Sequence, residues 1–247
     1  MMAIDAAPVV LGGIALPDTI FQTQSFAVLA ATAGFVDAHF FLHVSQVFTA
    51  NMSGNLVLFG MAMGEKEWAH GAHQAVALFA FVTGVFAASR FHDLHRRAGK
   101  LLRPDLLLGI EAAILVVVAA WVGFFSANHP GERVLVYPAI ALAAFAMGMQ
   151  NAAVLRVGAI AVATTYATGS VARLGSESAL AFGATSKEEA AAHLGVVPVL
   201  AAMIASYVFG AVFAAAVGAS AAWLLLPAGV LGLASVGTHR RLRVRAA

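Results

Sequence analysis

Residues 25–64 read SFAVLAATAGFVDAHFFLHVSQVFTANMSGNLVLFGMAMG. The first half of this stretch is an apolar run that contains a single acidic residue, Asp37. A cluster of Thr, Asn, Ser and Gly follows at 49–55, and the apolar run after it, 56–63, has only one glycine and would form a helix of about 12 Å. A bilayer has about 30 Å of hydrocarbon, so this second run covers less than half of it. The stretch predicts a spanning helix followed by an interrupted segment.

The composition of the whole chain agrees with a membrane protein. Of its 247 residues, 61% are hydrophobic and 11% are charged, whereas a soluble domain carries about 25% charged residues. This excludes a soluble enzyme, a disordered chain and a nucleic-acid partner, because each needs a polar exterior or clustered charge. With no cysteine there is no disulfide or thiolate metal site. The lipid bilayer is the expected partner.

We expect an all-α, polytopic membrane protein with about six transmembrane helices, because the pattern lacks the alternation of barrel strands. The six long apolar stretches are 26–44, 75–91, 106–126, 134–155, 194–217 and 219–236. Two further stretches, 45–64 and 157–180, are interrupted by small polar residues and glycine. Either could cross the bilayer or re-enter on the same side.

Basic residues bear on the topology, because Lys and Arg concentrate on the cytoplasmic side of membrane proteins. Nine of the 14 basic residues fall in two clusters: Arg90, Arg96, Arg97, Lys100 and Arg103, then Arg240, Arg241, Arg243 and Arg245. Both clusters lie inside if neither interrupted stretch crosses, or if one of them, the first, does. They lie on opposite sides if both cross.

The two halves of the chain resemble each other. GFVDA at 34–38 is echoed by GMQNA at 148–152, and TANMSGNL at 49–56 by TTYATGSV at 164–171. Equivalent segments should behave alike, so both interrupted segments either cross or turn back. Because only turning back places both basic clusters inside, we expect both segments to turn back. Each half then crosses three times, which predicts two inverted-topology repeats with both termini cytoplasmic. The predicted organisation is an N-terminal tail 1–24, repeat 25–126, repeat 134–237 and a basic C-terminal tail 238–247. The tail at 1–24 has no basic start, so we expect it to be unprocessed.

The runs AGFVDAHFFLHVSQVFTANMSGNLVLFGMAMG and MGMQNAAVLRVGAIAVATTYATGSVARL also resemble the YoaK-type family of bacterial membrane proteins, a domain of unknown function. The resemblance covers roughly residues 25–236. It rests on the Asp in the first span, the Ser-Gly-Asn turn, and the later GMQNA and TTYxTG signatures. It implies a bacterial inner-membrane protein of about six spans, without a substrate or reaction.

The candidate site gathers the polar residues that interrupt the apolar background. The expected substrate or ion pathway consists of Asp37, Thr49, Asn51, Ser53, Gly54, Asn55, Gln150, Asn151, Thr164, Thr165, Tyr166, Thr168 and Gly169, with Arg173 and Glu177 as candidate gate residues that can pair at four-residue spacing. An ionisable group at the depth of Asp37 is usually functional. The alternatives are that Asp37 caps a broken helix, and that the small polar residues only pack helices. Gly54 and Gly169 are expected to permit the helix breaks.

Other polar residues are weaker candidates. Glu111 lies about six residues into its span and is expected to be hydrated near the inner surface. The pair His39 and His43 is expected to pack or line a pore. Glu67, His70 and His73 are expected to be solvated in a loop. We expect no metal site and no cofactor. Gly210, Ala214 and Gly218 have the small-xxx-small spacing of a close helix contact, internal or between copies in a homo-oligomer.

The leading hypothesis is a small-solute secondary transporter or channel-like permease with a midplane site at the repeat interface. One alternative is a membrane-embedded enzyme with Ser53 as nucleophile, although no Gly-x-Ser-x-Gly elbow is present. The other is a non-catalytic assembly or lipid-organising protein. The solute or ion stays open in each case.

Overall fold

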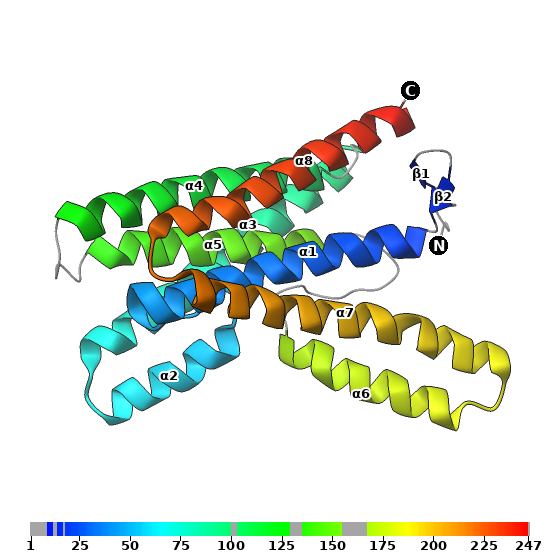
Figure 1. Ribbon diagram of the computed structural model, residues 1–247, viewed down its shortest axis with the longest axis horizontal. Helices are drawn as coiled ribbons and strands as arrows, with labels where there is room; N and C mark the ends of the chain where they lie inside the picture. The colour runs from blue at the N-terminus through cyan, green and yellow to red at the C-terminus, as the bar shows by residue number, and fades with distance from the viewer. Residues whose placement is uncertain are drawn as a thin grey trace.

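The computed structural model is an all-helical bundle with a small N-terminal hairpin (Figure 1). It describes residues 9–11, 14–16, 18–99, 103–128, 135–154 and 167–246. The helices are α1 (Asp18–His39), the π-helix η1 (Phe40–Ser45), α2 (Met52–Gly64), α3 (Trp68–Arg97), α4 (Pro104–Asn128), α5 (Val136–Val154), α6 (Ala167–Gly183), α7 (Lys187–Val217), the 3-10 turn η3 (Ala221–Leu224) and α8 (Leu225–Ala246). The strands β1 (Val9–Leu11) and β2 (Ile14–Leu16) pair antiparallel within the expected tail.

Long apolar helices dominate the part of the chain that the structure describes. Five of them have the length and composition to cross a membrane: Phe26–Ser45, Trp68–Arg97, Pro104–Phe125, Lys187–Val217 and Ala221–His239. The other expected span corresponds to α5. It has 19 residues, and Gln150 and Asn151 lower its mean hydropathy. The predicted fold class of an all-α polytopic membrane protein is thus confirmed.

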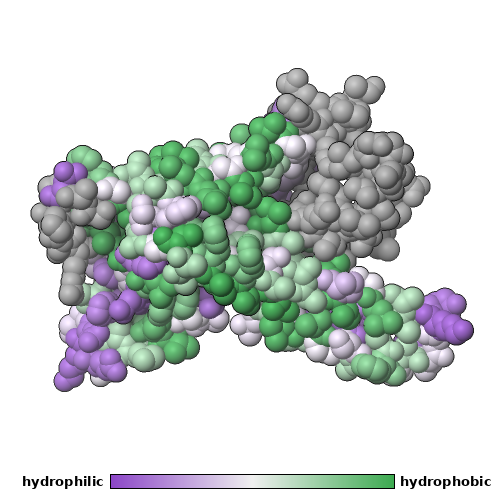
Figure 2. Space-filling model, in the orientation of Figure 1, coloured by the Kyte–Doolittle hydropathy of each residue, from purple (hydrophilic) through white to green (hydrophobic). Residues whose placement is uncertain are grey.

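The surface agrees with lipid as the solvent. Aromatic side chains such as Phe79, Phe86 and Phe209 face outward, and Phe182 is 94% exposed. In Figure 2 the middle of the long axis is mainly hydrophobic, and the hydrophilic residues gather at the two ends. A soluble protein rarely exposes so much contiguous apolar surface, so these helices contact the lipid bilayer.

The helices run lengthwise in two directions. Figure 1 shows α1, α4 and α7 running one way along the long axis, and α3, α5 and α8 running the other way. In α4 and α8 this is also clear from contacts. Ser235 and His239, in the middle and second half of α8, bond to Asp105 at the start of α4, whereas η3, before α8, lies at the end of α4. Figure 1 also shows α2 and α6 starting near the middle of the long axis and running to opposite ends.

Two glycine pairs allow close helix crossings. A Cβ on Gly34 of α1 would overlap the carbonyl of Tyr207 in α7, and one on Gly210 of α7 would overlap the carbonyl of Ala31. In α3 and α5 a second set of contacts has the same form: Gly84 lies against Phe145 and Gly148 against Phe81. Backbones this close require residues without a side chain. The small-residue contact predicted at Gly210 is therefore internal, whereas Gly218 instead ends α7 with a φ of 84°.

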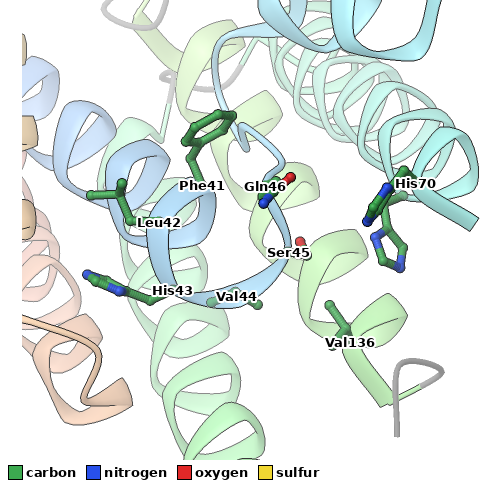
Figure 3. A pocket seen from close by; sticks show the side chains of 9 residues that line it. Phe41, Leu42, His43, Val44, Ser45, Gln46, His70 and Val136 are labelled. Carbon is green, nitrogen blue, oxygen red and sulfur yellow. The ribbon is translucent and has the colours of Figure 1, made fainter. Parts of the chain in front are cut away.

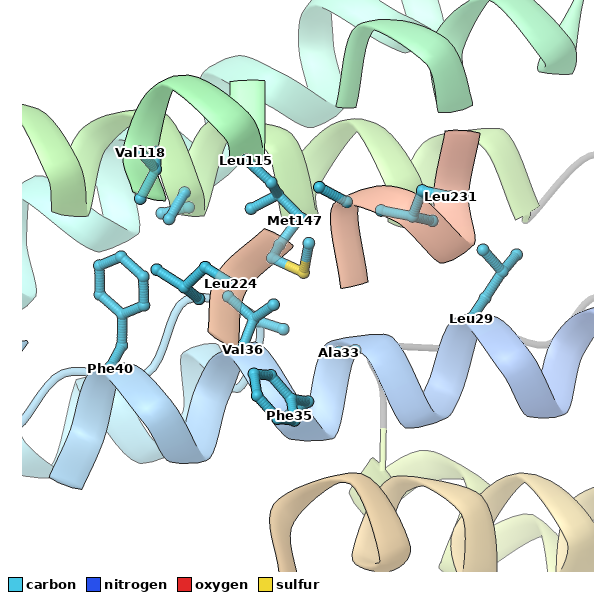
Figure 4. Packing of buried hydrophobic residues seen from close by; sticks show 14 of the residues in the cluster. Leu29, Ala33, Phe35, Val36, Phe40, Leu115, Val118, Met147, Leu224 and Leu231 are labelled. Atoms are coloured by element: carbon cyan, nitrogen blue, oxygen red, sulfur yellow. The ribbon is translucent and has the colours of Figure 1, made fainter. Parts of the chain in front are cut away.

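The core lies between α1, α4, α5 and α8 (Figure 4). The apolar face of α1 carries Leu29, Ala33 and Val36, and Phe40 at the start of η1 continues it; all four are buried. It packs against a set of buried side chains from the other three helices and η3, namely Leu115, Val118, Met147, Leu224 and Leu231. This core fixes the position of α1, and with it Asp37 in the last turn of that helix.

Candidate functional site

Asp37 is the centre of a dense hydrogen-bond cluster. Its Oδ1 accepts the backbone N–H groups of Thr49 and Ala50, both at 2.6 Å, and the Thr49 hydroxyl at 3.0 Å. Its Oδ2 accepts the N–H of Asn51 at 3.0 Å and the hydroxyl of Tyr207, from α7, at 2.5 Å. Asp37 is only 2% exposed. Five donors fill the acceptor capacity of one carboxylate, which is about four lone-pair sites.

The cluster places the start of α2. Asn51 is the N-cap of α2, and its side-chain oxygen accepts the N–H of Gly54 at 3.3 Å and the hydroxyl of Ser53 at 2.9 Å. Because Asp37 binds the three N–H groups that precede Met52, it fixes the direction in which the chain enters α2. Of the two roles open for Asp37, this geometry favours the structural one.

Asn55 and Gly54 lock the loop before α2 from the other side. Asn55 is fully buried; it accepts the N–H of Phe48 at 2.9 Å and donates to the Phe48 carbonyl at 2.6 Å. A Cβ on Gly54 would come within 2.8 Å of the Phe48 ring. The expectation that Gly54 and Gly169 break a helix was wrong, because each lies in the first turn of a helix, α2 or α6. Gly54 makes room for a ring.

A π-helix precedes the loop. The segment η1 continues α1 for six residues and ends at Gln46, which has a left-handed φ of 54°. Short π-helical turns inside α-helices are frequent at functional sites. The chain reverses here after passing the depth of Asp37, so that α2 can start near the middle of the molecule (Figure 1).

A polar cavity of about 280 Å³ lies between η1, the start of α3 and the start of α5 (Figure 3). Its polar lining comes from His43, Ser45, Gln46, His70 and His73. Among the described residues, His43 Nε2 and Ser45 Oγ are buried without a hydrogen-bond partner. Unsatisfied buried polar atoms are uncommon in native proteins and call for a ligand or water. The cavity is therefore suited to a small polar molecule.

His70 and His73 are placed differently from the expectation, whereas His39 is packed as one of its expected roles requires. His70 and His73 lie in the first two turns of α3, not in a loop, and the ring of buried His73 lies 4.8 Å from that of Tyr137. His39 is fully buried between the rings of Phe35 and His43. Within the described ranges no group of three or more His, Cys, Asp or Glu is arranged to hold a metal ion.

The second half is only partly described. Thr164, Thr165 and Tyr166 lie outside the described residues, while Thr168 and Gly169 lie in the first turn of α6. Gln150 is fully buried and donates to the carbonyl of Leu29 at 3.1 Å, so it joins α5 to α1.

The candidate gate residues form an ion pair. Arg173 Nε lies 3.2 Å from Glu177 Oε1, as the four-residue spacing predicts. His193 of α7 lies 2.8 Å from the other oxygen of Glu177. These hydrogen bonds, from His193 first and then Arg173, lower the pKa of Glu177. The cluster fastens α6 to α7.

Glu111 is not where the sequence led us to expect it. Its side chain is fully buried, and among the described residues both carboxyl oxygens lack a hydrogen-bond partner. Hydropathy predicts depth along a helix, not which face is covered by neighbours. Glu111 follows Leu107 by four residues, and Leu107 packs with Ala88 of α3 and Met149 of α5.

Comparison with known proteins places the chain in a family. A family model described as "Protein of unknown function (DUF1275)" matches residues 25–237. The chain is 33% identical over 157 residues to the "UPF0700 transmembrane protein YoaK" of Bacillus subtilis (strain 168), a match that covers 62% of this chain and 66%, just under two thirds, of that relative. No solved structure matches. The family match covers most of the chain, and the relative that it resembles is a transmembrane protein. The chain therefore belongs to the DUF1275 family, as the resemblance in its two polar motifs predicted.

Proposed function

We propose that this protein is a small-solute secondary transporter or channel-like permease, with its path at the middle of the molecule between two inverted halves. The observation that carries the proposal is the position of α2 and α6. Both start near the middle of the long axis and run to opposite ends (Figure 1). Transporters commonly form midplane sites from such broken segments.

The helix directions support a topology in which neither α2 nor α6 crosses. If α6 crossed, α4 and α8 would be parallel, but they are antiparallel. If α2 alone crossed, α1 and α7 would be antiparallel, but they run in the same direction. Six crossings also put both basic clusters on one side, and the positive-inside rule makes that side the cytoplasm. We therefore infer an inner-membrane protein with cytoplasmic termini.

The glycine crossings support the inverted repeat. Gly34 and Gly148 are equivalent at an offset of 114, and Gly84 and Gly210 at an offset of 126. Each of the four faces the carbonyl three residues before its partner glycine. The crossing of α1 with α7 thus has the same form as that of α5 with α3, as a two-fold relation between the halves requires.

The proposed path uses the side chains that remain available around the helix starts. Ser53 and Thr168 are exposed in the first turns of α2 and α6, and Asn51 and Asn151 are half-buried. Hydroxyl and amide groups suit a small polar solute. In this proposal Asp37, Thr49, Gly54 and Asn55 position α2, and Arg173 with Glu177 holds α6 at the cytoplasmic end.

The enzymatic alternative is weaker. A nucleophilic serine needs an adjacent base that accepts its proton, but the Ser53 hydroxyl donates to the amide oxygen of Asn51. An amide oxygen is not a base.

Solute flux into proteoliposomes tests the proposal. Stopped-flow light scattering over a panel of small polar solutes should show uptake by the natural protein. Ser53→Leu and Thr168→Leu should reduce that uptake, because each removes a hydroxyl from the path. The matched control is Gly60→Leu on α2, where a Cβ meets open space. Equal uptake by all three variants would contradict the proposed path.

A further inference from the structure

Among the residues that the structure describes, one buried acidic side chain lies outside the hydrogen-bond clusters. Glu111 is fully buried in α4, and within the described part of the chain nothing donates a hydrogen bond to either of its carboxyl oxygens. It lies on the same face of α4 as Leu107, whose side chain packs with Ala88 of α3 and with Met149 and Ala152 of α5. Apolar side chains of α3 and α5 therefore lie beside this face of α4.

A carboxylate cannot remain charged in such a place. Moving an ionised carboxylate into an apolar interior without a donor or counter-ion is very unfavourable, and the group takes up a proton instead. The contrast with Asp37 is direct, because Asp37 is surrounded by five donors that stabilise its charge. Both oxygens of Asp37 accept hydrogen bonds, whereas among the described residues neither oxygen of Glu111 does.

Titratable groups lie on the helices around α4. On α3, buried His92 follows Ala88 by about one turn. On α8, partly exposed His239 is bound to Asp105 at 2.8 Å. On α5 the titratable residue is Tyr137, near the opposite end of that helix from Met149.

We propose that Glu111 is a proton-binding site. The carboxyl group carries a proton while α3, α4 and α5 are packed together. When that contact opens to water, the O–H bond breaks and the proton passes to water, leaving the carboxylate. The inference rests on the proposed permease function, for which Glu111 would bind the coupling proton.

Infrared difference spectroscopy in lipid nanodiscs tests the site without a solute. At neutral pH the natural protein should show a carboxylic-acid C=O band that is absent in Glu111→Gln, which has the size of the neutral acid. Glu111→Asp should shift the band, and it serves as a second variant if Glu111→Gln does not fold. Glu65→Gln, at an exposed acid, is the matched control and should leave the band intact. A spectrum unchanged in both Glu111 variants would overturn the proposal.

A flux measurement separates this inference from the proposed function. Uptake of the solute panel with and without a pH gradient should depend on the gradient in the natural protein and be independent of it in Glu111→Gln. A band that Glu111→Gln removes, in a protein that moves none of the solutes, would uphold the proton site and contradict the permease. A gradient dependence that survives in Glu111→Gln would overturn the coupling role.

Discussion

At the scale of single residues, the acidic groups inside the bundle divide into two kinds. Asp37 receives donors from residues 12–14 positions away and from Tyr207, 170 positions away. Glu111 receives none among the described residues. Hydrogen bonds from donors favour the charged form of a carboxyl group, whereas burial without donors favours the neutral form. The same chemical group therefore has two roles, set by its neighbours.

Substitution at Asp37 should weaken the fold rather than only alter ion dependence. Asp37→Asn removes the charge and places an NH₂ group against N–H or O–H donors, so we expect the free energy of unfolding to fall by about 2–4 kcal/mol. Tyr207→Phe removes one interhelical hydrogen bond and should cost about 1–2 kcal/mol. Thermal unfolding in detergent measures both. An unchanged midpoint in Asp37→Asn would refute the structural role.

The sequence predicted that Asp37 matters but could not predict its partners. A lone acid in an apolar run is visible from composition alone. That its oxygens bind the N–H groups of 49–51 depends on the chain reversal after η1, and the Tyr207 contact depends on the α1–α7 crossing. Neither is encoded in a local pattern. The burial of Glu111 was missed for the same reason.

At the scale of helices, the molecule is held together by close crossings and by the anchored start of α2. Hydropathy predicted the long helices well, because a run of about 20 apolar residues has few alternatives in lipid. It did not predict η1 or the exact start of α2. Those depend on the side chains of Asn51 and Asn55, which form hydrogen bonds with backbone groups that have no partner within a helix.

Adding one methyl group at a crossing glycine should destabilise the fold. Gly34→Ala and Gly148→Ala place a Cβ against a partner backbone, and overpacking of this kind costs about 1–3 kcal/mol. Gly60→Ala, in open space, should instead stabilise α2 by about 0.5–1 kcal/mol through helix propensity. Unfolding midpoints of the three variants check the opposite signs. Similar midpoints for all three variants would contradict this, because they would mean that the crossing helices can move apart at little cost in stability.

The attachment of α6 to α7 should depend on pH. The pKa of Glu177 is lowered by its hydrogen bonds to His193 and Arg173. A lowered carboxyl pKa contributes stability above its ordinary value of 4.5, and this stability is lost as the pH falls through the lowered value. The difference in unfolding midpoint between the natural protein and Glu177→Gln should be present at pH 7 and vanish in acid. A difference that persisted in acid would exclude the ionised carboxylate as its source.

At the scale of the whole molecule, the proposed topology puts the loops after α2 and after α6 on opposite sides. The chain has no cysteine, so each single-cysteine variant has one reactive site. Glu65→Cys and Asn128→Cys should react with an impermeant maleimide from outside intact cells, and Lys187→Cys only after the cells are opened. The cysteine-free parent is the control. Reaction of Glu65→Cys and Lys187→Cys from the same side would contradict the inverted halves.

The repeat was the most informative global feature of the sequence. Short echoes at offsets of 114 and 115 led to the prediction that the two interrupted segments are equivalent. The exchange of partners, with α1 beside α7 and α3 beside α5, could not be predicted from the echoes. If α1 had packed against α3 and α5 against α7, within each half, the sequence echoes would have been the same.

The exchanged pairs affect how the protein is made. The ribosome delivers α1 long before α7, so Asp37 enters the bilayer without the hydroxyl of Tyr207 and Gly34 enters without its covering helix. The same holds for α3 until α5 emerges. A nascent chain that has only reached α4 has two uncovered glycine faces and an incompletely bonded carboxylate. Its first half must be sheltered by the insertion machinery until translation supplies the second.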